Sequence, residues 1–169
     1  MISGKDCFEK YGFGYDIEST DLNEQLQFER KYMTLYDIPT AMEIGAIPKR
    51  VYCNKDLVKP LDDAFKHLIE RNLIDELKTY DGCFNPRPIR GYYTRFNEAI
   101  KNNDIDEAIR LLSLHTWGIA VDVNSAWNRL GKTPTLTEDF VQCFLDAGFD
   151  WGGNFKRFDG MHFQLAKII

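Results

Sequence analysis

The chain has 169 residues, of which 44% are hydrophobic and 28% are charged, an ordinary composition for a globular protein and far from that of a disordered one. This length can bury a substantial apolar core in one compact unit without disulfide support. The formal net charge of −5 argues against nucleic acid as a partner, because surfaces that bind nucleic acid are usually basic.

Cysteine spacing and the N-terminal sequence exclude further classes. The four cysteines, Cys7, Cys53, Cys83 and Cys143, form no C-x-x-C pair, so we expect reduced structural residues rather than a zinc knuckle or a dithiol redox site. The N-terminus lacks a basic start followed by an apolar run, and no window approaches the ~20 apolar residues of a membrane span. We therefore expect synthesis in the cytoplasm without a signal peptide, and no membrane insertion.

The first half of the chain is predicted to contain an extension, a strand and a long helix. Residues 1–46 are weakly periodic, which indicates an N-terminal extension packed on a domain formed by residues 47–169, with one short helix around residues 21–35. Residues 48–53 favour a strand that leads into a helix, where Asp56 can cap and Pro60 suits the first turn. The apolar face of this helix is Leu61, Phe65, Leu68, Ile69 and Leu73.

The second half alternates short strands, loops and helices. A strand is predicted near residues 76–80, followed by a turn at Asp81 and Gly82. Prolines and a glycine force a loop over residues 83–91, and residues 94–112 favour one or two short amphipathic helices. A helix over residues 136–147 is indicated by capping-box spacing from Thr135 to Glu138 and by a stop at Gly148.

Two segments concentrate the residue types that bind metals. Two of the three histidines lie in them: His115, seven residues before Asp122, and His162, three residues after Asp159. In a strand, Asp122 projects from the face opposite its branched apolar neighbours, and His162 shares a face with Gln164. The third histidine, His67, has no acidic or histidine partner one helical turn later, so we interpret it as a boundary residue.

Two imidazoles and one carboxylate form a set of ligands suited to catalytic zinc. Zinc bound by three protein ligands keeps a fourth position for water, and it lowers the pKa of that water to about 7. We predict that His115, Asp122 and His162 bind Zn²⁺, and that Asp159 accepts the proton as a neighbouring base. The alternative is that both histidines are hydrogen-bonded core residues and that both aspartates cap turns.

The same residues resemble a known family. The motifs S-x-H-x-x-G-x-A-x-D at residues 113–122 and D-x-x-H-F at residues 159–163 are similar to those of the M15 zinc peptidases, which include D-alanyl-D-alanine carboxypeptidases and phage L-alanyl-D-glutamate endolysins. The loop at residues 83–91 and the W-G-G sequence at residues 151–153 resemble the phage-type branch of this family. The resemblance spans roughly residues 47–167.

The resemblance implies roles for further residues. An arginine before the first histidine would polarise the scissile carbonyl, with Arg87 as the first candidate and Arg90 as the second. A surface salt bridge is the alternative for each arginine. Ser113 resembles the motif serine that lies near the substrate, with a plain turn hydroxyl as the alternative. Trp117, inside the motif, is expected near the site, with core packing as the alternative. Residues 92–112 depart from the phage-type pattern because they separate the arginine loop from the first histidine, and they could form a substrate-selecting wall or a surface excursion.

Together these observations predict an α+β domain in which a small antiparallel sheet carries the metal ligands and helices pack on the other face. By the resemblance, the fold is of the Hedgehog/DD-peptidase type. The expected activity is zinc-dependent hydrolysis of a peptide bond in the bacterial cell-wall stem peptide, with L-alanyl–D-glutamate as the first candidate bond and D-alanyl–D-alanine as the second. We expect a monomer that reaches the wall after release from the host cytoplasm or as a virion component. The alternative from another class is a non-catalytic phage virion or tail protein that binds the wall.

Overall fold

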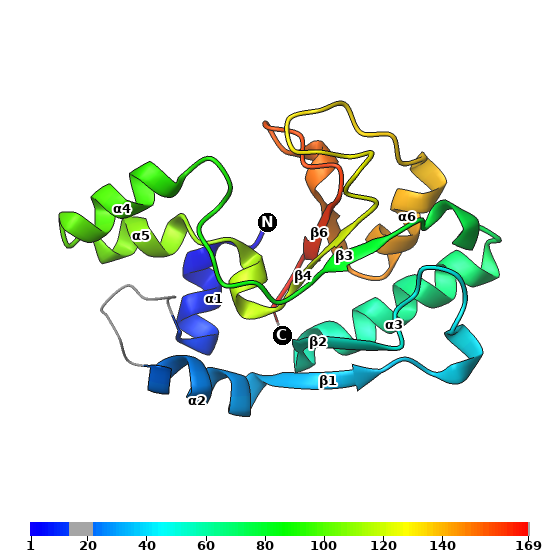
Figure 1. The fold of residues 1–169 in the computed structure, drawn as a ribbon, viewed down its shortest axis with the longest axis horizontal. Helices are drawn as coiled ribbons and strands as arrows, with labels where there is room; N and C mark the ends of the chain where they lie inside the picture. Colours follow the sequence, from blue (N-terminus) through cyan, green and yellow to red (C-terminus); the bar gives the residue numbers. More distant parts are fainter. Residues whose placement is uncertain (14–21, 169) are drawn as a thin grey trace.

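The computed structural model describes residues 1–13 and 22–168 (Figure 1). Helices and strands alternate irregularly along the chain, and four of the helical segments, labelled η, are short 3₁₀ helices. In chain order the elements are α1 (Gly4–Tyr11), α2 (Leu22–Tyr32), β1 (Met33–Asp37), η1 (Thr40–Met42), β2 (Arg50–Asn54), α3 (Lys55–Glu70), η2 (Ile74–Glu76), β3 (Tyr80–Gly82), α4 (Tyr93–Lys101), α5 (Ile105–Arg110), η3 (Leu114–Trp117), β4 (Ala120–Val123), α6 (Glu138–Asp146), β5 (Phe149–Trp151), η4 (Gly152–Asn154) and β6 (His162–Leu165).

The strands form two antiparallel sheets. Strands β1 and β2 pair as a hairpin, and the second sheet has the order β3-β4-β6-β5. The predicted α+β class is confirmed, because the described residues combine α-helices with small sheets whose strands all pair antiparallel. The predicted boundary at residue 46 falls between the two strands of the hairpin, and the division of the chain there stays a prediction.

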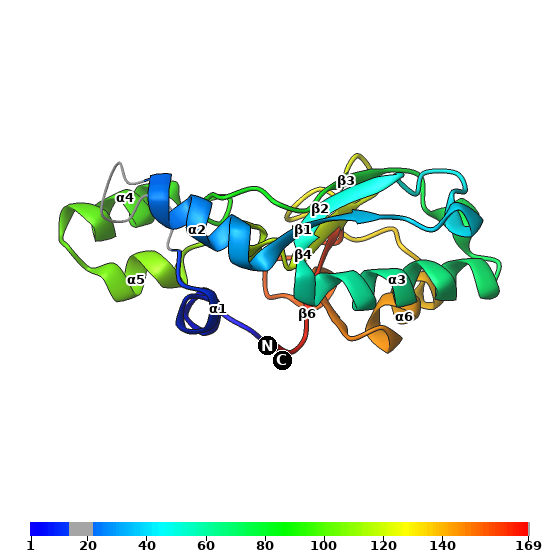
Figure 2. The ribbon, with the colours of Figure 1, turned by 90° about the horizontal axis from the view of Figure 1, so that it is seen from below.

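Helices α3 and α6 cover one face of the four-stranded sheet (Figure 2). Phe144 of α6 stacks on Phe163 of β6 with ring centroids 4.2 Å apart, and Phe65 of α3 meets Tyr80 of β3 edge to face. These three phenylalanines are fully buried. Burial of each large aromatic side chain contributes a few kcal/mol to folding, so this face anchors the sheet and leaves the opposite face for the candidate site.

Several predicted boundaries differ from the structure. The helix expected around residues 21–35 ends at Tyr32, and the chain continues as β1; residue 21 lies outside the described residues. Helix α3 begins at Lys55 with Asn54 as its cap, so Pro60 lies inside the helix rather than in its first turn. Backbone hydrogen bonds decide at which residue a helix begins and ends, and these bonds cannot be read from the pattern of residues.

Two further local predictions were wrong in detail. Residues 74–76 form η2 and the strand starts at Tyr80, so the predicted turn at Asp81 and Gly82 is part of β3, where an irregular register accommodates the glycine. Helix α6 is capped by Thr137, whose hydroxyl accepts from the Phe140 N–H, and not by Thr135. Residues 94–112 were predicted to form one or two short helices; the structure has two, α4, which begins one residue earlier at Tyr93, and α5.

Helices α4 and α5 pack together and project from one end of the molecule, and α5 packs next to α1 (Figure 1). The contact with α1 is very close, because a Cβ atom added to Gly4 would lie 2.3 Å from the Ile109 carbonyl oxygen. All four cysteines are buried and unpaired. Among the described residues, no helix combines the length and the hydropathy required to cross a membrane.

Asn54 connects the hairpin to the centre of the molecule. Its side chain is fully buried, caps α3 by accepting from the Asp56 N–H at 3.0 Å, and donates to the Trp117 carbonyl at 3.1 Å. Its backbone N–H donates to the Gly118 carbonyl at 3.0 Å. Asn54 therefore joins β2 to the start of α3 through its side chain, and to the end of η3 and the following turn through its side chain and backbone.

We predict that Asn54→Ala lowers the free energy of unfolding by about 2–3 kcal/mol, because it removes a helix cap and leaves a buried carbonyl without its donor. Urea unfolding followed by circular dichroism measures this change. Asn97→Ala, at an exposed position of α4, is the matched control. A loss below about 0.5 kcal/mol, the usual range for surface substitutions, would contradict the linking role of Asn54.

Candidate active site

Asp122 and His162 face each other across two neighbouring strands. They are paired residues in the antiparallel register of β4 and β6, so their side chains project from the same face of the sheet. Gln164 follows two residues later on β6, and its side chain lies on that face as well. This is the face opposite α3 and α6.

His115 reaches the same place from η3, not from a strand. Ser113 caps this short helix, and Gly118 ends it in the left-handed conformation with φ 64°. A Cβ atom at Gly118 would lie 2.8 Å from Met33 Cε and 3.0 Å from the Asn54 nitrogen, so the hairpin closes tightly over the turn. Glycine is required here both for its φ angle and for the close approach.

Three ligand atoms converge where these elements meet. His115 Nε2 lies 3.1 Å from Asp122 Oδ1, His162 Nδ1 lies 3.3 Å from the same oxygen, and the two nitrogens are 3.2 Å apart. Ligand atoms of the three residues all lie within 4.8 Å of one another. The structure thus brings together the three residues predicted to bind zinc.

Hydrogen bonds on the far side of each ring decide which nitrogen faces the centre. His115 Nδ1 lies 2.6 Å from the Cys83 carbonyl oxygen, which can only accept, so Nδ1 carries the proton and Nε2 presents a lone pair. His162 Nε2 likewise donates to Gln164 Oε1 at 3.1 Å, which leaves the Nδ1 lone pair directed inward. Both outer partners hold the rings in the orientation that metal ligation requires.

This arrangement fits a divalent metal ion. Two lone pairs and a carboxylate oxygen at about 3 Å repel one another unless a positive charge lies between them. Two nitrogens and one oxygen are ligands that zinc accepts, and three protein ligands are typical of a catalytic zinc site. The chemistry of the donors therefore matches the predicted cofactor.

The pKa shifts of Asp122 and His162 also show that positive charge is favoured at this point. Burial raises the pKa of Asp122, but the hydrogen bonds and charges of His115 and His162 outweigh burial and hold this pKa well below its usual range. Burial lowers the pKa of His162, whereas the hydrogen bond and charge of Asp122 raise it, and the net pKa lies above the ordinary value. The point where the side chains meet is thus electrostatically suited to a cation.

Asp159 stands next to this centre without entering the cluster of ligands. Its carbonyl accepts from the His162 N–H at 3.0 Å, and its own N–H donates to the Gly152 carbonyl at 2.9 Å. A Cβ atom at Gly152 would lie 2.4 Å from the Asp159 carbonyl oxygen and 3.1 Å from His162 Cβ. Burial raises the pKa of the Asp159 carboxyl, and the charge of His162 opposes this shift.

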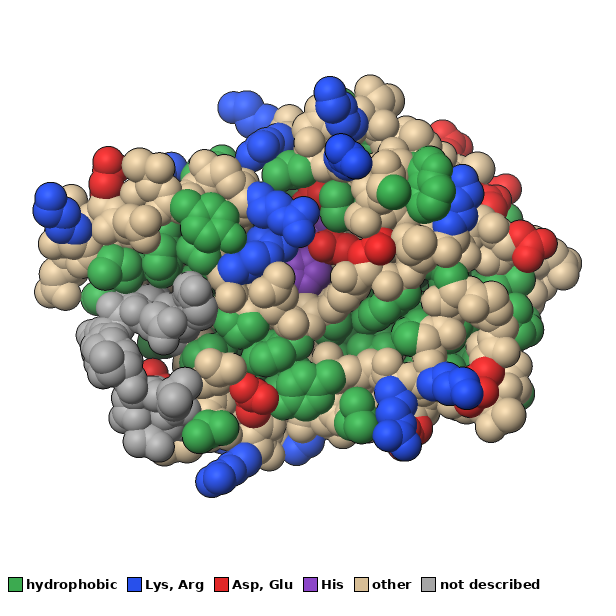
Figure 3. Space-filling model, in the orientation of Figure 1, with side chains coloured by type: hydrophobic (Ala, Val, Ile, Leu, Met, Phe, Trp, Pro, Cys, Tyr) green, Lys and Arg blue, Asp and Glu red, His purple; other side chains and the backbone are tan. Residues whose placement is uncertain are grey.

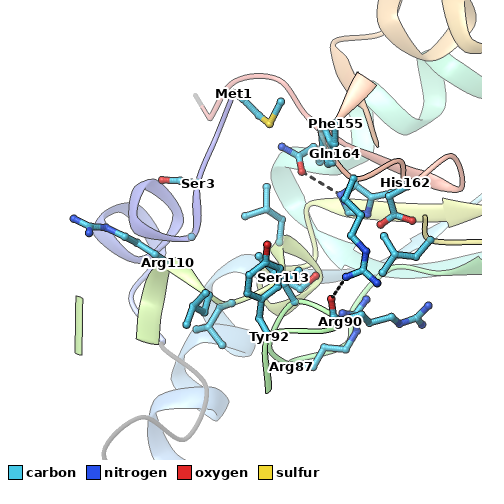
Figure 4. Close-up of a pocket in the computed structure, with 18 of the residues that line it drawn as sticks. Met1, Ser3, Arg87, Arg90, Tyr92, Arg110, Ser113, Phe155, His162 and Gln164 are labelled. Atoms are coloured by element: carbon cyan, nitrogen blue, oxygen red, sulfur yellow. Dashed lines mark hydrogen bonds between the residues drawn. The ribbon is translucent and has the colours of Figure 1, made fainter. Parts of the chain in front are cut away.

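The site opens into a cleft of about 520 Å³, to which Asp122, Asp159 and His162 contribute lining atoms. In Figure 3, the histidine is visible at the surface between acidic and basic side chains. Ser113, Arg87 and Arg90 also line the cleft (Figure 4). Trp117 does not: it is fully buried, and its Nε1 donates to the Gly12 carbonyl at 2.9 Å.

Arg87 is half-buried in the wall of the cleft. Its Nη1 donates to the Pro88 carbonyl at 3.2 Å, and its buried Nε has no hydrogen-bond partner among the described residues. Burial and, secondarily, the charge of Arg90 lower the pKa of Arg87, while Asp122 and Asp159 oppose this shift. The side chain therefore lies within electrostatic range of the candidate metal centre.

The C-terminal part of the chain matches a known protein family. Residues 107–165 match the family model described as D-alanyl-D-alanine carboxypeptidase, an M15 peptidase model. The resemblance to the M15 peptidases is confirmed. The matched segment contains His115, Asp122, Asp159 and His162 but neither Arg87 nor Arg90.

The chain was also compared with solved structures and with curated proteins. The chain is similar to the crystal structure of the Serratia marcescens L-Ala D-Glu endopeptidase ChiX, with 20% identity and a TM-score of 0.37 over 67% of this chain and 80% of that chain. A comparison with curated proteins gives no match. The roles of individual residues therefore depend on the geometry and on the motifs.

Some groups that shape the site could not be recognised from the sequence pattern. The Cys83 carbonyl, which fixes the His115 ring, is a backbone atom and leaves no trace in the residue pattern. Arg157, which reaches the cleft, lies far from the motif arginines in sequence. Gly152 belongs to the W-G-G sequence, and the structure supplies a physical reason for that glycine.

We predict that His162→Ala lowers zinc affinity by more than about 100-fold, because loss of even an outer partner of a ligand costs about 10–100-fold. Calorimetric titration of metal-depleted protein measures the affinity. His67→Ala is the matched control, since His67 lies on α3 and its Nδ1 donates to the Cys143 carbonyl at 3.0 Å. Equal zinc affinity in the two variants would exclude His162 as a ligand.

Proposed function

We propose that this protein is a zinc-dependent peptidase that hydrolyses a peptide bond in the stem peptide of bacterial peptidoglycan. The observation that carries the proposal is the convergence of His115 Nε2, His162 Nδ1 and Asp122 Oδ1 at one point beside an open cleft. The M15 match over residues 107–165 supports a peptidase, and the family description supports a cell-wall peptide as substrate.

The two histidines and Asp122 would hold the zinc ion. Bound zinc supplies Lewis acidity, which polarises a carbonyl group and makes water a stronger acid. The carbonyl of Cys83 and the side chain of Gln164 hold the two imidazole rings in orientation, so the ligands need little rearrangement on binding.

Asp159 is suited to proton transfer. Burial raises the pKa of its carboxyl, which makes the carboxylate a better proton acceptor than an exposed aspartate. The backbone contacts with Gly152 and His162 fix its position at the edge of the cleft. We assign to Asp159 the uptake of a proton from the attacking water and its delivery to the leaving amine.

Arg87 is suited to stabilising the oxygen of the scissile carbonyl. Its guanidinium is part of the cleft wall, is partly desolvated, and lies within electrostatic range of Asp122 and Asp159. A fixed donor in a partly dry site stabilises developing negative charge more strongly than the same donor in water. Arg90 is the second candidate for this role, and Ser113 is a candidate contact to the substrate at the same wall.

The L-alanyl–D-glutamate bond is our first candidate, because residues 83–91 and 151–153 resemble the phage-type members. The D-alanyl–D-alanine bond is the second, and the description of the matched family model favours it. The proposed place of action is the bacterial cell wall, reached after release from the host cytoplasm or as part of a virion. A monomer with its own complete site is sufficient for this activity.

We predict that Asp159→Ala keeps zinc binding and loses about 10²–10⁴-fold in turnover, the usual contribution of a general acid or base. Metal analysis and hydrolysis rates of stem peptides measure the two properties separately. Asp150→Ala, in the neighbouring strand β5 and outside the cleft lining, is the control. Full turnover by Asp159→Ala would remove Asp159 from the mechanism.

Mass spectrometry of digested peptidoglycan identifies the bond and tests the proposed activity directly. We expect new amino termini at D-glutamate. New amino groups on free D-alanine would support the second candidate bond instead. A protein that binds peptidoglycan and releases no fragments would contradict the peptidase proposal and favour the non-catalytic wall-binding protein.

A further inference from the structure

Positive charge gathers in the lining of the cleft, although the whole chain carries a net charge of −5. Basic side chains cluster beside the histidine in Figure 3. Among the described residues, the acidic side chains that line the cleft are Asp122 and Asp159, both already assigned to the candidate active site. The basic residues in the lining are Arg87, Arg90, Arg95, Arg110, Lys156 and Arg157.

Two of these arginines are joined by a backbone contact. Arg157 Nη1 donates to the Arg90 carbonyl at 3.1 Å, a bond drawn in Figure 4. The guanidinium also lies directly against Gly91, where an added Cβ atom would be 2.5 Å from the same nitrogen. The loop after β3 therefore holds the Arg157 guanidinium in place, and a side chain at residue 91 would displace this guanidinium.

Three of the arginines that line the cleft form no ion pair with another described residue. Among residues 1–13 and 22–168, no carboxylate forms an ion pair with Arg87, Arg90 or Arg157. The other two arginines differ, since Arg95 pairs with Glu107, and Arg110 points away from His162 in Figure 4. Guanidinium groups gathered in one cleft without an ion-paired carboxylate favour the binding of an anion.

The two candidate substrates share an anion at one position. In the stem peptide, D-glutamate is linked onward through its side-chain carboxyl, so its α-carboxylate is free. In a terminal D-alanyl–D-alanine unit, the last residue carries the terminal carboxylate. In both cases the leaving nitrogen is bonded to an α-carbon that also bears a free carboxylate, so the carboxylate carbon is two bonds from the scissile amide nitrogen.

We propose that Arg90 and Arg157 bind the free α-carboxylate of the residue that supplies the leaving amine. This inference rests on the proposed function and adds the feature of the substrate that the cleft selects. A guanidinium presents paired N–H donors that match the two oxygens of a carboxylate. Arg87, which lines the same cleft and is more buried than Arg90, keeps its assignment to the carbonyl oxygen.

The test compares each substrate with its amidated form. The peptides are L-Ala–γ-D-Glu–L-Lys and the same peptide with D-isoglutamine, together with acyl-D-Ala–D-Ala and its C-terminal amide. We expect the wild type to prefer the free acid of its substrate by about 10- to 100-fold in kcat/KM, the range for hydrogen bonds to charged groups. Arg157→Gln is expected to reduce this preference to within about threefold, with little change for the amide.

Two further variants make the comparison specific. Arg90→Gln is expected to weaken the preference in the same direction as Arg157→Gln. Arg129→Gln removes the same charge at an exposed position outside the cleft lining, and is expected to retain the full preference. If Arg157→Gln slows the acid and the amide equally, or leaves the preference intact, the inference is wrong.

A binding measurement separates this inference from the peptidase proposal. Calorimetric titration uses γ-D-Glu–L-Lys and D-alanine, the products that carry the leaving amine, and their amidated forms. If no peptide is cleaved, the proposed function fails, and the titration decides the inference. Binding that requires the carboxylate and is lost in Arg157→Gln supports it, and binding that is absent or independent of the carboxylate overturns it.

Discussion

Mutual repulsion between two imidazole lone pairs and a carboxylate is the constraint on which the site depends. His115 Nε2, His162 Nδ1 and Asp122 Oδ1 lie within 3.1–3.3 Å of one another, a geometry that a divalent ion between them would stabilise. The protein holds this arrangement with bonds on the outer sides of both rings. Folding free energy thus keeps the ligands in place, so the site is preorganised for an ion.

The N-terminal hairpin supports this arrangement from outside the matched segment. Met33 and Asn54 close over Gly118, and the Asn54 side chain holds the Trp117 carbonyl, so the turn that carries His115 cannot relax independently of the hairpin. Helix α1 reaches the same turn through the bond from Trp117 Nε1 to the Gly12 carbonyl. Residues before position 55 therefore position a side chain of the candidate metal centre.

The identity of the candidate ligands could be predicted because it depends on local patterns. Alternation along two short strands placed Asp122 and His162 on polar faces, and the structure pairs them across β4 and β6. Three other features depend on contacts between distant segments. They are the position of His115 on a 3₁₀ helix, the contact of Arg157 with Gly91, and the close packing of Gly152. Sequence patterns do not encode such contacts directly, which is why Trp117 was expected near the substrate although its ring packs in the core.

X-ray absorption at the zinc edge of the metal-loaded protein tests the central claim most directly. The account predicts one zinc ion with two imidazole nitrogens at about 2.0–2.1 Å, oxygen atoms at about 2.0–2.2 Å, and no sulfur near 2.3 Å. A spectrum with sulfur scattering, or with a single imidazole, would place the metal elsewhere and contradict the account.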